Sequence, residues 1–424
     1  LTDVAELAPG RAHTCARRGA QVQCWGNNED GQLGDGKGAK PGARSTTPVA
    51  VQGINDATQL SAGDGHVCAL RRAGTVSCWG LGGDGQLSAV SERSPQPRAI
   101  AGLTGVAQIA SGGNHVCARK QTGAVVCWGR NTEGQLGDGA SGSKIKPVAV
   151  KGLTDAVDLV AGGTHTCAKR RAGGVVCWGD NRGGQLGNEV RQAWVTPTQI
   201  PGLADAAEVA PGAQHTCART RTGKVLCWGT GPQGQLGDGS SRHTAPAPVA
   251  NLTDATLLVS GGDHSCALRR GGTVVCWGSD FGKTPTAVAG VSKVAELTAG
   301  AAHTCARSNA DLLCWGHNER GQLGDGSRDN RSAGAPVRAL ADAKGLAAGA
   351  RHTCALTRSG GVCTPSSRAA VSGATISSRA MAVGVRRALV LVQELVLSQK
   401  LRPSANPTAI SAAQLPSTRQ PSQL

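Results

Sequence analysis

Short stretches of alternating apolar and polar residues, separated by glycine turns, occupy the beginning of the chain. Val4–Ala8 alternates weakly, His13–Arg17 alternates clearly, Val22–Trp25 follows across a turn, and Pro48–Val51 is a fourth extended piece. Period-two alternation over so few residues is typical of β-strands. No run of ten or more residues with helical periodicity occurs before residue 380. The pattern therefore predicts four short strands between residues 4 and 51.

The same phrase returns along the chain, so the strand pattern is a repeat. Each copy runs from His-x-Cys-Ala through a turn to Cys-Trp-Gly and, in most copies, on to Gly-Gln-Leu-Gly. The copies begin at eight histidines: His13, His66, His115, His165, His215, His264, His303 and His352. Glycine supplies 62 of 424 residues, which disfavours a helical solenoid because Gly costs a helix interior about 1 kcal/mol relative to Ala. Four short strands per period predict the blades of a β-propeller.

The phrase Trp-Gly-x-Asn-x-x-Gly-Gln-Leu-Gly-x-Gly followed by Gly-x-x-His resembles the regulator-of-chromosome-condensation repeat, whose members form seven-bladed β-propellers. Residues 1–363 carry the resemblance, with seven copies of Cys-Trp-Gly and six of Gly-Gln-Leu. It implies an all-β, seven-bladed propeller of four-stranded blades over residues 1–363. The sixth copy lacks the Gly-Gln-Leu phrase, and the eighth breaks off at Cys363. We expect the N-terminal strands and the hairpin at residues 344–363 to compete for, or share, closure of the ring.

The composition changes abruptly after Cys363. Residues 364–424 hold seven Lys/Arg and one acid, lack Cys and Trp, and are rich in Ser, Ala and Pro. This composition predicts a mostly disordered, low-complexity basic tail, with a short amphipathic helix as a candidate near residues 380–401.

All sixteen cysteines lie in the repeated phrase, two per copy. A hairpin folded about its central turn places the two members opposite each other, within reach of a bridge. We therefore predict one local disulfide per copy, pairing Cys15 with Cys24, Cys68 with Cys78, Cys117 with Cys127, Cys167 with Cys177, Cys217 with Cys227, Cys266 with Cys276, Cys305 with Cys314 and Cys354 with Cys363. The alternatives are free buried thiols and metal binding by His-x-Cys with the second Cys. Disulfides would place the protein outside the cytoplasm, in the periplasm, on the cell surface or in the medium, whereas free thiols would favour the cytoplasm.

The repeated histidines and tryptophans are interpreted as structural. The histidines recur at one phase without a neighbouring serine or acid at fixed spacing, so we expect each imidazole to bond backbone near the adjacent blade. The tryptophans of Cys-Trp-Gly supply the large apolar area for packing between blades. Trp194 lies outside the phrase, in a variable loop, and is either a local packing plug or an exposed interface anchor.

The net charge is +16, and cations recur just after His-x-Cys-Ala. Residues at the same position of each repeat lie on the same rim of a propeller, so these cations should form a ring. That ring is either a set of solvated turns or an anion-binding face. The candidate partner-binding residues are Arg17, Arg18, Arg71, Arg72, Arg119, Lys120, Lys169, Arg170, Arg171, Arg269 and Arg270, with Trp194 as an anchor. No aromatic residues interleave with the charges, which disfavours single-stranded nucleic acid, while contact with the backbone of duplex DNA stays physically possible but is not favoured.

These features favour a non-catalytic binding module, secreted or surface-exposed, that engages a protein or an anionic ligand. No nucleophile–base pair, carboxylate dyad or closed metal site is visible, so we expect neither an enzyme nor a bound cofactor. The resemblance implies an alternative, guanine-nucleotide exchange on a small GTPase, but only structural positions of the repeat match. We also expect a monomer without a membrane span and, because the chain begins at Leu1 rather than Met, a processed or truncated product.

Overall fold

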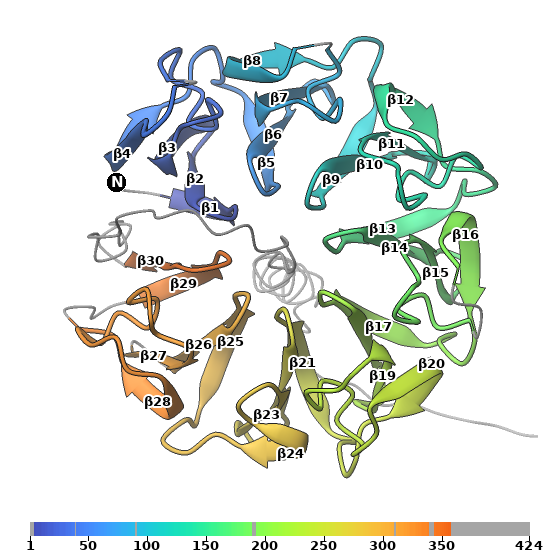
Figure 1. The fold of residues 1–424 in the computed structure, drawn as a ribbon, viewed down its shortest axis with the longest axis vertical. Helices are drawn as coiled ribbons and strands as arrows, with labels where there is room; N and C mark the ends of the chain where they lie inside the picture. Colours follow the sequence, from blue (N-terminus) through green and yellow to red (C-terminus); the bar gives the residue numbers. More distant parts are fainter. Residues whose placement is uncertain are drawn as a thin grey trace, which may run out of the picture. The chain divides into compact units, whose positions relative to one another are not determined.

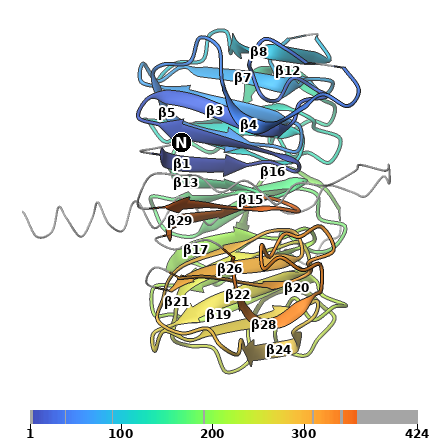
Figure 2. The ribbon, with the colours of Figure 1, turned by 90° about the vertical axis from the view of Figure 1, so that its left-hand side faces the viewer.

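The computed structural model describes residues 4–38, 40–89, 91–188, 192–308, 311–338 and 343–357. Every regular element of these residues is a β-strand, and 28 of the strands form seven four-stranded sheets, as the sequence predicts. We number these sheets blades 1 to 7 in chain order (Figure 1). Seen from the side, the strands run from one face of the ring to the other (Figure 2).

Blades 1 to 4 consist of β1 (Val4–Pro9), β2 (His13–Arg18), β3 (Gln21–Asn27) and β4 (Arg44–Ala50); β5 (Ala57–Ala62), β6 (His66–Arg71), β7 (Val76–Leu81) and β8 (Arg93–Ala99); β9 (Val106–Ser111), β10 (His115–Lys120), β11 (Val125–Gly129) and β12 (Lys144–Ala149); and β13 (Ala156–Ala161), β14 (His165–Arg170), β15 (Val175–Gly179) and β16 (Trp194–Ile200). Blades 5 to 7 consist of β17 (Ala206–Pro211), β18 (His215–Thr220), β19 (Val225–Thr230) and β20 (Arg242–Pro248); β21 (Ala255–Ser260), β22 (His264–Arg269), β23 (Val274–Gly278) and β24 (Gly282–Ala287); and β25 (Val294–Ala299), β26 (His303–Ser308), β27 (Asp311–Gly316) and β28 (Arg331–Pro336).

Each blade is an antiparallel meander whose first strand lies innermost (Figure 1). In blade 4 the register of the middle strands places Cys167 opposite Cys177 and Thr166 opposite Trp178. The hairpin turns on glycine, because Gly173 and Gly174 adopt φ of 91° and 84°, a region that other residues rarely enter. Local sequence alone therefore sets the pairing inside a blade.

The apolar cores lie between blades. Trp178 and Ala168 of blade 4 pack with Leu136 of blade 3, whereas Cys167 and Cys177 of the same blade face blade 5. Alternate residues of a middle strand therefore face opposite neighbours, so both sides of the sheet are covered. This explains why Val175–Gly179 is buried along its whole length.

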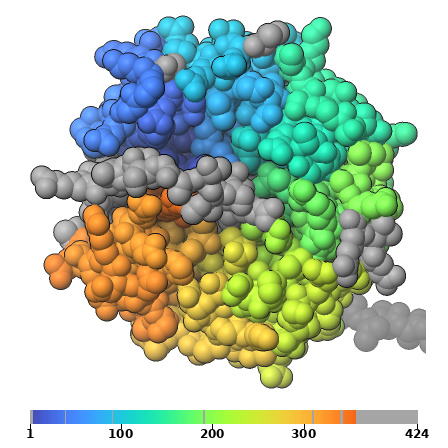
Figure 3. Space-filling view, viewed as in Figure 1, coloured from blue at the N-terminus to red at the C-terminus, as the bar shows by residue number. Residues whose placement is uncertain are grey.

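An additional two-stranded sheet occupies the place between blade 7 and blade 1. It consists of β29 (Ala343–Ala348) and β30 (Thr353–Thr357), and β29 lies beside β25 and β26 on one side and β1 on the other (Figure 1). The hairpin and the N-terminal strands both take part in closing the ring, because β29 and β30 contact β1 and His352 bonds Thr14 of β2. Among the described residues no sheet combines strands from both ends, and the sheets succeed one another in chain order (Figure 3).

The basic tail predicted at residues 364–424, with its candidate helix near 380–401, lies outside the described residues. The domain boundary at residue 363 therefore stays a prediction. Within the described part of the chain, no helix is long and apolar enough to cross a membrane.

Candidate functional site

Disulfides join the second and third strands of all seven blades. The bonded pairs are Cys15–Cys24, Cys68–Cys78, Cys117–Cys127, Cys167–Cys177, Cys217–Cys227, Cys266–Cys276 and Cys305–Cys314, each with Cα atoms 4.1 Å apart. Every sulfur of these pairs is buried, so the bridges lock the hairpins from within the cores between blades. In the eighth copy Cys354 is buried on β30, and its predicted partner Cys363 lies outside the described residues.

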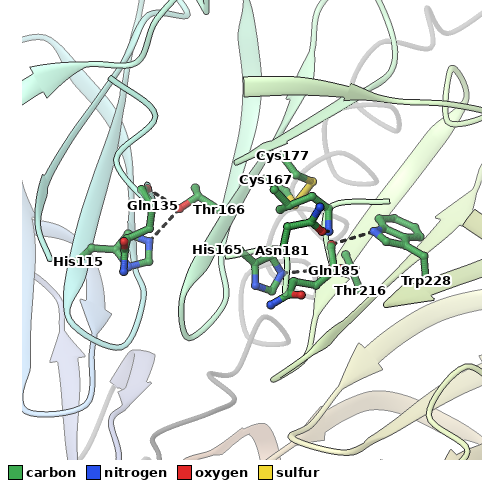
Figure 4. Close-up of a disulfide and its surroundings, with 11 residues drawn as sticks. His115, Gln135, His165, Thr166, Cys167, Cys177, Asn181, Gln185, Thr216 and Trp228 are labelled. Carbon is green, nitrogen blue, oxygen red and sulfur yellow. Dashed lines mark hydrogen bonds between the residues drawn. A yellow bond between two sulfur atoms is a disulfide. The ribbon is translucent and has the colours of Figure 1, made fainter. Parts of the chain in front are cut away.

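The repeated histidines bond from one blade to the next. In Figure 4, Nε2 of His115 lies 2.8 Å from Oγ1 of Thr166, and Nε2 of His165 lies 3.1 Å from Oγ1 of Thr216. The other pairs of this kind are His215 with Ser265, His264 with Thr304, His303 with Thr353 and His352 with Thr14, at 2.7–2.9 Å. The neighbouring blade was predicted correctly, but the partner is a side-chain hydroxyl and not the backbone.

His13 and His66 are the exceptions. The next blade carries Val67 and Val116 where the others carry Thr or Ser, because the phrase reads His-Val-Cys in these two copies. Neither Nε2 has a hydrogen-bond partner among the described residues. The residue after each histidine thus decides whether the preceding blade is bonded.

Burial keeps these imidazoles neutral. It lowers the pKa of His13, His115, His215 and His303 to about 3, and that of His66, His165, His264 and His352 to about 4. The side chains are at most 8% exposed. Rings this deeply enclosed do not reach a substrate, so their role is structural.

The tryptophans also connect adjacent blades, as predicted. The indole N–H of Trp228 donates to the backbone carbonyl of Gln185 in the Gly-Gln-Leu loop of the preceding blade, at 2.9 Å (Figure 4). Equivalent bonds of 2.8–3.0 Å join Trp79 to Gln32, Trp128 to Gln86, Trp178 to Gln135 and Trp277 to Gln235. Trp25 and Trp315 lack such a partner among the described residues, because the preceding copies lack the Gly-Gln-Leu phrase.

Trp194 lies at the start of the outermost strand β16 and not in a loop. It pairs with Gly179 of β15, is half-buried, and packs against the core between blades 4 and 5. These contacts favour the packing interpretation over that of an exposed anchor.

The Asn of the Trp-Gly-x-Asn phrase holds the Gly-Gln-Leu loop in shape, a role that sequence reasoning missed. Oδ1 of Asn131 accepts a hydrogen bond from the N–H of Leu136 at 3.0 Å, and its Nδ2 donates to Oδ1 of Asp138 at 3.3 Å. The Asp of the Gly-Asp-Gly turn is therefore engaged within its own loop. The only signal in the sequence was the recurrence of Asn at this phase.

The structure divides the predicted rim cations into paired and exposed groups. The paired cations contact a carboxylate of the same blade at 2.6–3.2 Å: Arg17 with Glu6, Arg71 with Asp56, Lys169 with Asp158, Arg170 with Asp155, Arg219 with Glu208, Arg269 with Asp254 and Arg307 with Glu296. Arg119 instead donates to the side chain of Gln108 at 3.0 Å. Much of the charge that the sequence places at this phase is therefore neutralised.

Three of these carboxylates also reach the next blade. Oε2 of Glu208 accepts the backbone N–H of Leu258 at 3.1 Å, and Oε1 of Glu296 accepts that of Leu346 at 3.2 Å. Glu6 bonds the backbone of blade 2 in the same way. These ion pairs are consequently part of the contact between blades.

The second group lies at the turns between second and third strands. Arg18, Arg72, Arg171, Arg221 and Arg270 are exposed, and Lys120 is half-buried. Because every one of these turns lies at the same end of its blade, the six side chains share one face of the ring. We call them the cationic rim; it contains the sequence candidates that point to solvent.

Comparison with known families matches residues 1–283 to the RCC1-like domain and residues 309–356 to the regulator of chromosome condensation (RCC1) repeat. Comparison with curated protein sequences gave no match. Among solved structures, human WBSCR16 is 20% identical with a TM-score of 0.65, covering 80% of this chain and 98% of that one. Yeast RCC1 (Prp20), in complex with Kap60, is 19% identical with a TM-score of 0.60, covering 82% and 79%. The family match spans well over half of the chain, and this protein therefore belongs to the RCC1-like domain family.

Proposed function

We propose that this protein is a non-catalytic binding propeller that works outside the cytoplasm and engages an acidic protein or another anionic surface through its cationic rim. The observation that supports it is the rim itself, in which six of the seven blades present a cation at the same turn. A rigid ring holds these charges at fixed separations, so an extended anionic partner meets several of them at once.

The proposed compartment rests on the disulfides. Seven blades each carry a bridge in a buried core, and such bridges persist in oxidising surroundings. In the cytoplasm glutathione and thioredoxin keep thiols reduced, so a set of structural disulfides of this kind is rare there.

Charge reversal of the rim tests the binding role. We expect Arg72→Glu with Arg171→Glu to weaken binding to an immobilised poly-glutamate surface and to reduce its salt dependence. The matched control reverses two exposed cations of the outermost strands, Lys146 and Lys283, and changes the net charge equally. Equal affinity of the rim variant, the control and the wild type would refute the role of the rim.

Guanine-nucleotide exchange is the second candidate, because the chain shares its fold with yeast RCC1 (Prp20) over most of its length. A further structure of Prp20p, whose title names binding to Gsp1p and histones, has a TM-score of 0.58 at 19% identity. Accelerated release of labelled GDP from candidate small GTPases, measured with the oxidised protein, would favour exchange over the binding role.

A further inference from the structure

The linker between β20 and β21 carries the sequence Asn251-Leu252-Thr253. This is the Asn-x-Ser/Thr pattern, with a middle residue other than proline, at which N-linked sugars are attached to proteins. Three residues match such a pattern by chance quite often, so the surroundings of the asparagine decide whether it is an acceptor. A bulky, hydrophilic glycan needs an asparagine on a surface loop with open space around it.

Asn251 occupies a position that is glycine in the other linkers between blades. The aligned residues are Gly53, Gly102, Gly152, Gly202 and Gly290. These glycines adopt φ between 68° and 74°, and Asn251 adopts φ of 54°, so all six lie in the left-handed region. Asparagine enters this region more readily than most other residues that carry a Cβ. The exchange of glycine for asparagine therefore creates the pattern and keeps the turn.

The backbone of this turn directs the asparagine side chain into solvent. A Cβ built on Gly53, Gly102, Gly152 or Gly202 meets no atom within 4 Å. Asn251 has its Cβ at the same place in the turn, and both Asn251 and Thr253 are exposed. Leu252 is only 1% exposed and belongs to the core between blades 5 and 6. Its burial fixes the residues on either side of it at the surface.

Backbone contacts place the turn on the face of the cationic rim. The N–H of Ala255 donates to the carbonyl of Gly223, and the N–H of Arg270 donates to the carbonyl of Asp254, both at 2.9 Å. Gly223 and Arg270 belong to the turns between the second and third strands of blades 5 and 6. A group carried by Asn251 would therefore stand between the rim turns of these two blades.

A second match to the pattern, Asn330-Arg331-Ser332, differs in its surroundings. Oδ1 of Asn330 accepts the backbone N–H of Asn318 at 2.8 Å, and the next residue pairs with Asp325 at 2.6 Å. The side chain of Asn251, in contrast, forms no hydrogen bond with any residue that the structure describes. Only the first match thus combines the pattern with an unengaged amide.

We propose that Nδ2 of Asn251 is the acceptor of an N-linked oligosaccharide. A C–N bond forms between Nδ2 and the anomeric carbon of a sugar, and the anomeric C–O bond to the diphosphate of a lipid-linked oligosaccharide donor breaks. Nδ2 loses a proton, and the lipid diphosphate leaves. The secretory compartment in which such glycans are attached also forms disulfides, of which this chain has one in each blade. The inference rests on the proposed compartment and not on binding through the cationic rim.

Secretion of the full chain from eukaryotic cells, followed by digestion with an amidase that removes N-linked glycans, tests the site. We expect one glycan per chain, seen as a single shift in electrophoretic mobility that the amidase reverses and that leaves aspartate at position 251. Asn251→Gly and Thr253→Ala should both abolish the shift. Asn251→Gly introduces the residue of the other linkers and so keeps the fold. The matched control, Asn330→Gln, should keep the shift.

Gly152→Asn tests the geometric argument directly. It converts Gly152-Leu153-Thr154 into the same pattern at a φ of 70°, so it should add a second shift of equal size. The absence of that second shift would refute the geometric argument. A secreted protein with intact bridges and no sugar on Asn251 would overturn the site but leave the proposed compartment standing, and a shift that survives in Asn251→Gly would also overturn the site. Free thiols in protein isolated from its own cells would refute the compartment and, with it, the modification there.

Discussion

Replacing Val67 with threonine should supply the hydrogen bond that the buried His13 ring lacks. Val67 is fully buried and stands where Thr166 stands in blade 4, with a hydroxyl that bonds Nε2 of His115 at 2.8 Å and the carbonyl of Gln135 at 3.3 Å. Threonine and valine have the same shape and are both β-branched, so the exchange changes the polarity of one group and leaves strand propensity almost unaltered.

Exchanging valine for threonine and threonine for valine should change the free energy of unfolding by different amounts. Val67→Thr adds a hydroxyl that finds a partner at once, which should stabilise the ring by about 0.5–1.5 kcal/mol. Thr166→Val removes two bonds and leaves a buried imidazole nitrogen unsatisfied, which should cost about 1–3 kcal/mol. With an unfolding entropy of about 2.1 cal/mol/K per residue over roughly 350 residues, these energies correspond to a rise of about 1–2 °C and a fall of about 1–4 °C in Tm.

Differential scanning calorimetry of the oxidised proteins at pH 7.5 measures both changes. The double variant should show nearly additive shifts, because the two sites lie in different contacts between blades. A lower Tm for Val67→Thr together with an unchanged Tm for Thr166→Val would refute the assignment of the histidine–hydroxyl bonds as stabilising contacts.

Three further predictions concern the same contacts. The depressed pKa values of the eight buried histidines, about 3 to 4 against 6.5 when unfolded, mean that the unfolded chain binds more protons between these limits. The contribution of the neutral histidines to the free energy of unfolding should therefore be fully present above pH 6.5 and be lost on acidification towards pH 4. The loss should reach about 1.4 kcal/mol per pH unit for each histidine. A Tm that stays constant from pH 7 to pH 4.5 would contradict this. Thiol titration of the denatured, unreduced protein should find no free thiol if Cys354 and Cys363 form the eighth bridge, and two free thiols would exclude that bridge. Removal of any one bridge should cost roughly 2–3 kcal/mol of stability, because each closes a loop of about ten residues. Gly137→Ala should destabilise the ring by about 1–3 kcal/mol more than Gly152→Ala, because both residues have φ near 70° but only the first would place a Cβ 2.8 Å from the next blade's tryptophan; equal denaturation midpoints would rule out that clash.

The sequence was sufficient for structure that is local. The strands, their turns and the cysteine pairs follow from alternation and glycine placement within one copy, because a meander pairs each strand with its neighbour in the chain. In blade 4, Cys167 and Cys177 already face each other once the hairpin is folded. The same reasoning identifies the tryptophans as the bulky side chains between blades.

Contacts between different copies of the repeat could not be predicted from the sequence alone. The hydroxyl after each histidine was visible in the sequence, yet only the offset of adjacent blades shows that His115 meets Thr166 rather than a residue of its own copy. The pairing of part of the predicted rim cations with acids was missed for a related reason. Arg71 and Asp56 are 15 residues apart in the sequence. Aligning the copies of the repeat identifies the recurring arginine but not the acid that pairs with it.

Ring closure could not be predicted, because the eighth copy is incomplete. Counting the copies of the repeat gives seven and a half units, but the count does not show whether the half unit joins an existing sheet. The structure places β29 and β30 as a separate sheet, joined to blade 1 through His352 and Thr14.

Because each disulfide closes a loop inside a single blade, no covalent cross-link bridges one blade to the next in the described structure. No covalent link between blades therefore fixes the point of the ring at which the chain begins. A circularly permuted chain, opened in the linker between β12 and β13 and rejoined by a spacer from β30 to β1, retains all seven bridges. In such a permutant the chain begins and ends between blades 3 and 4.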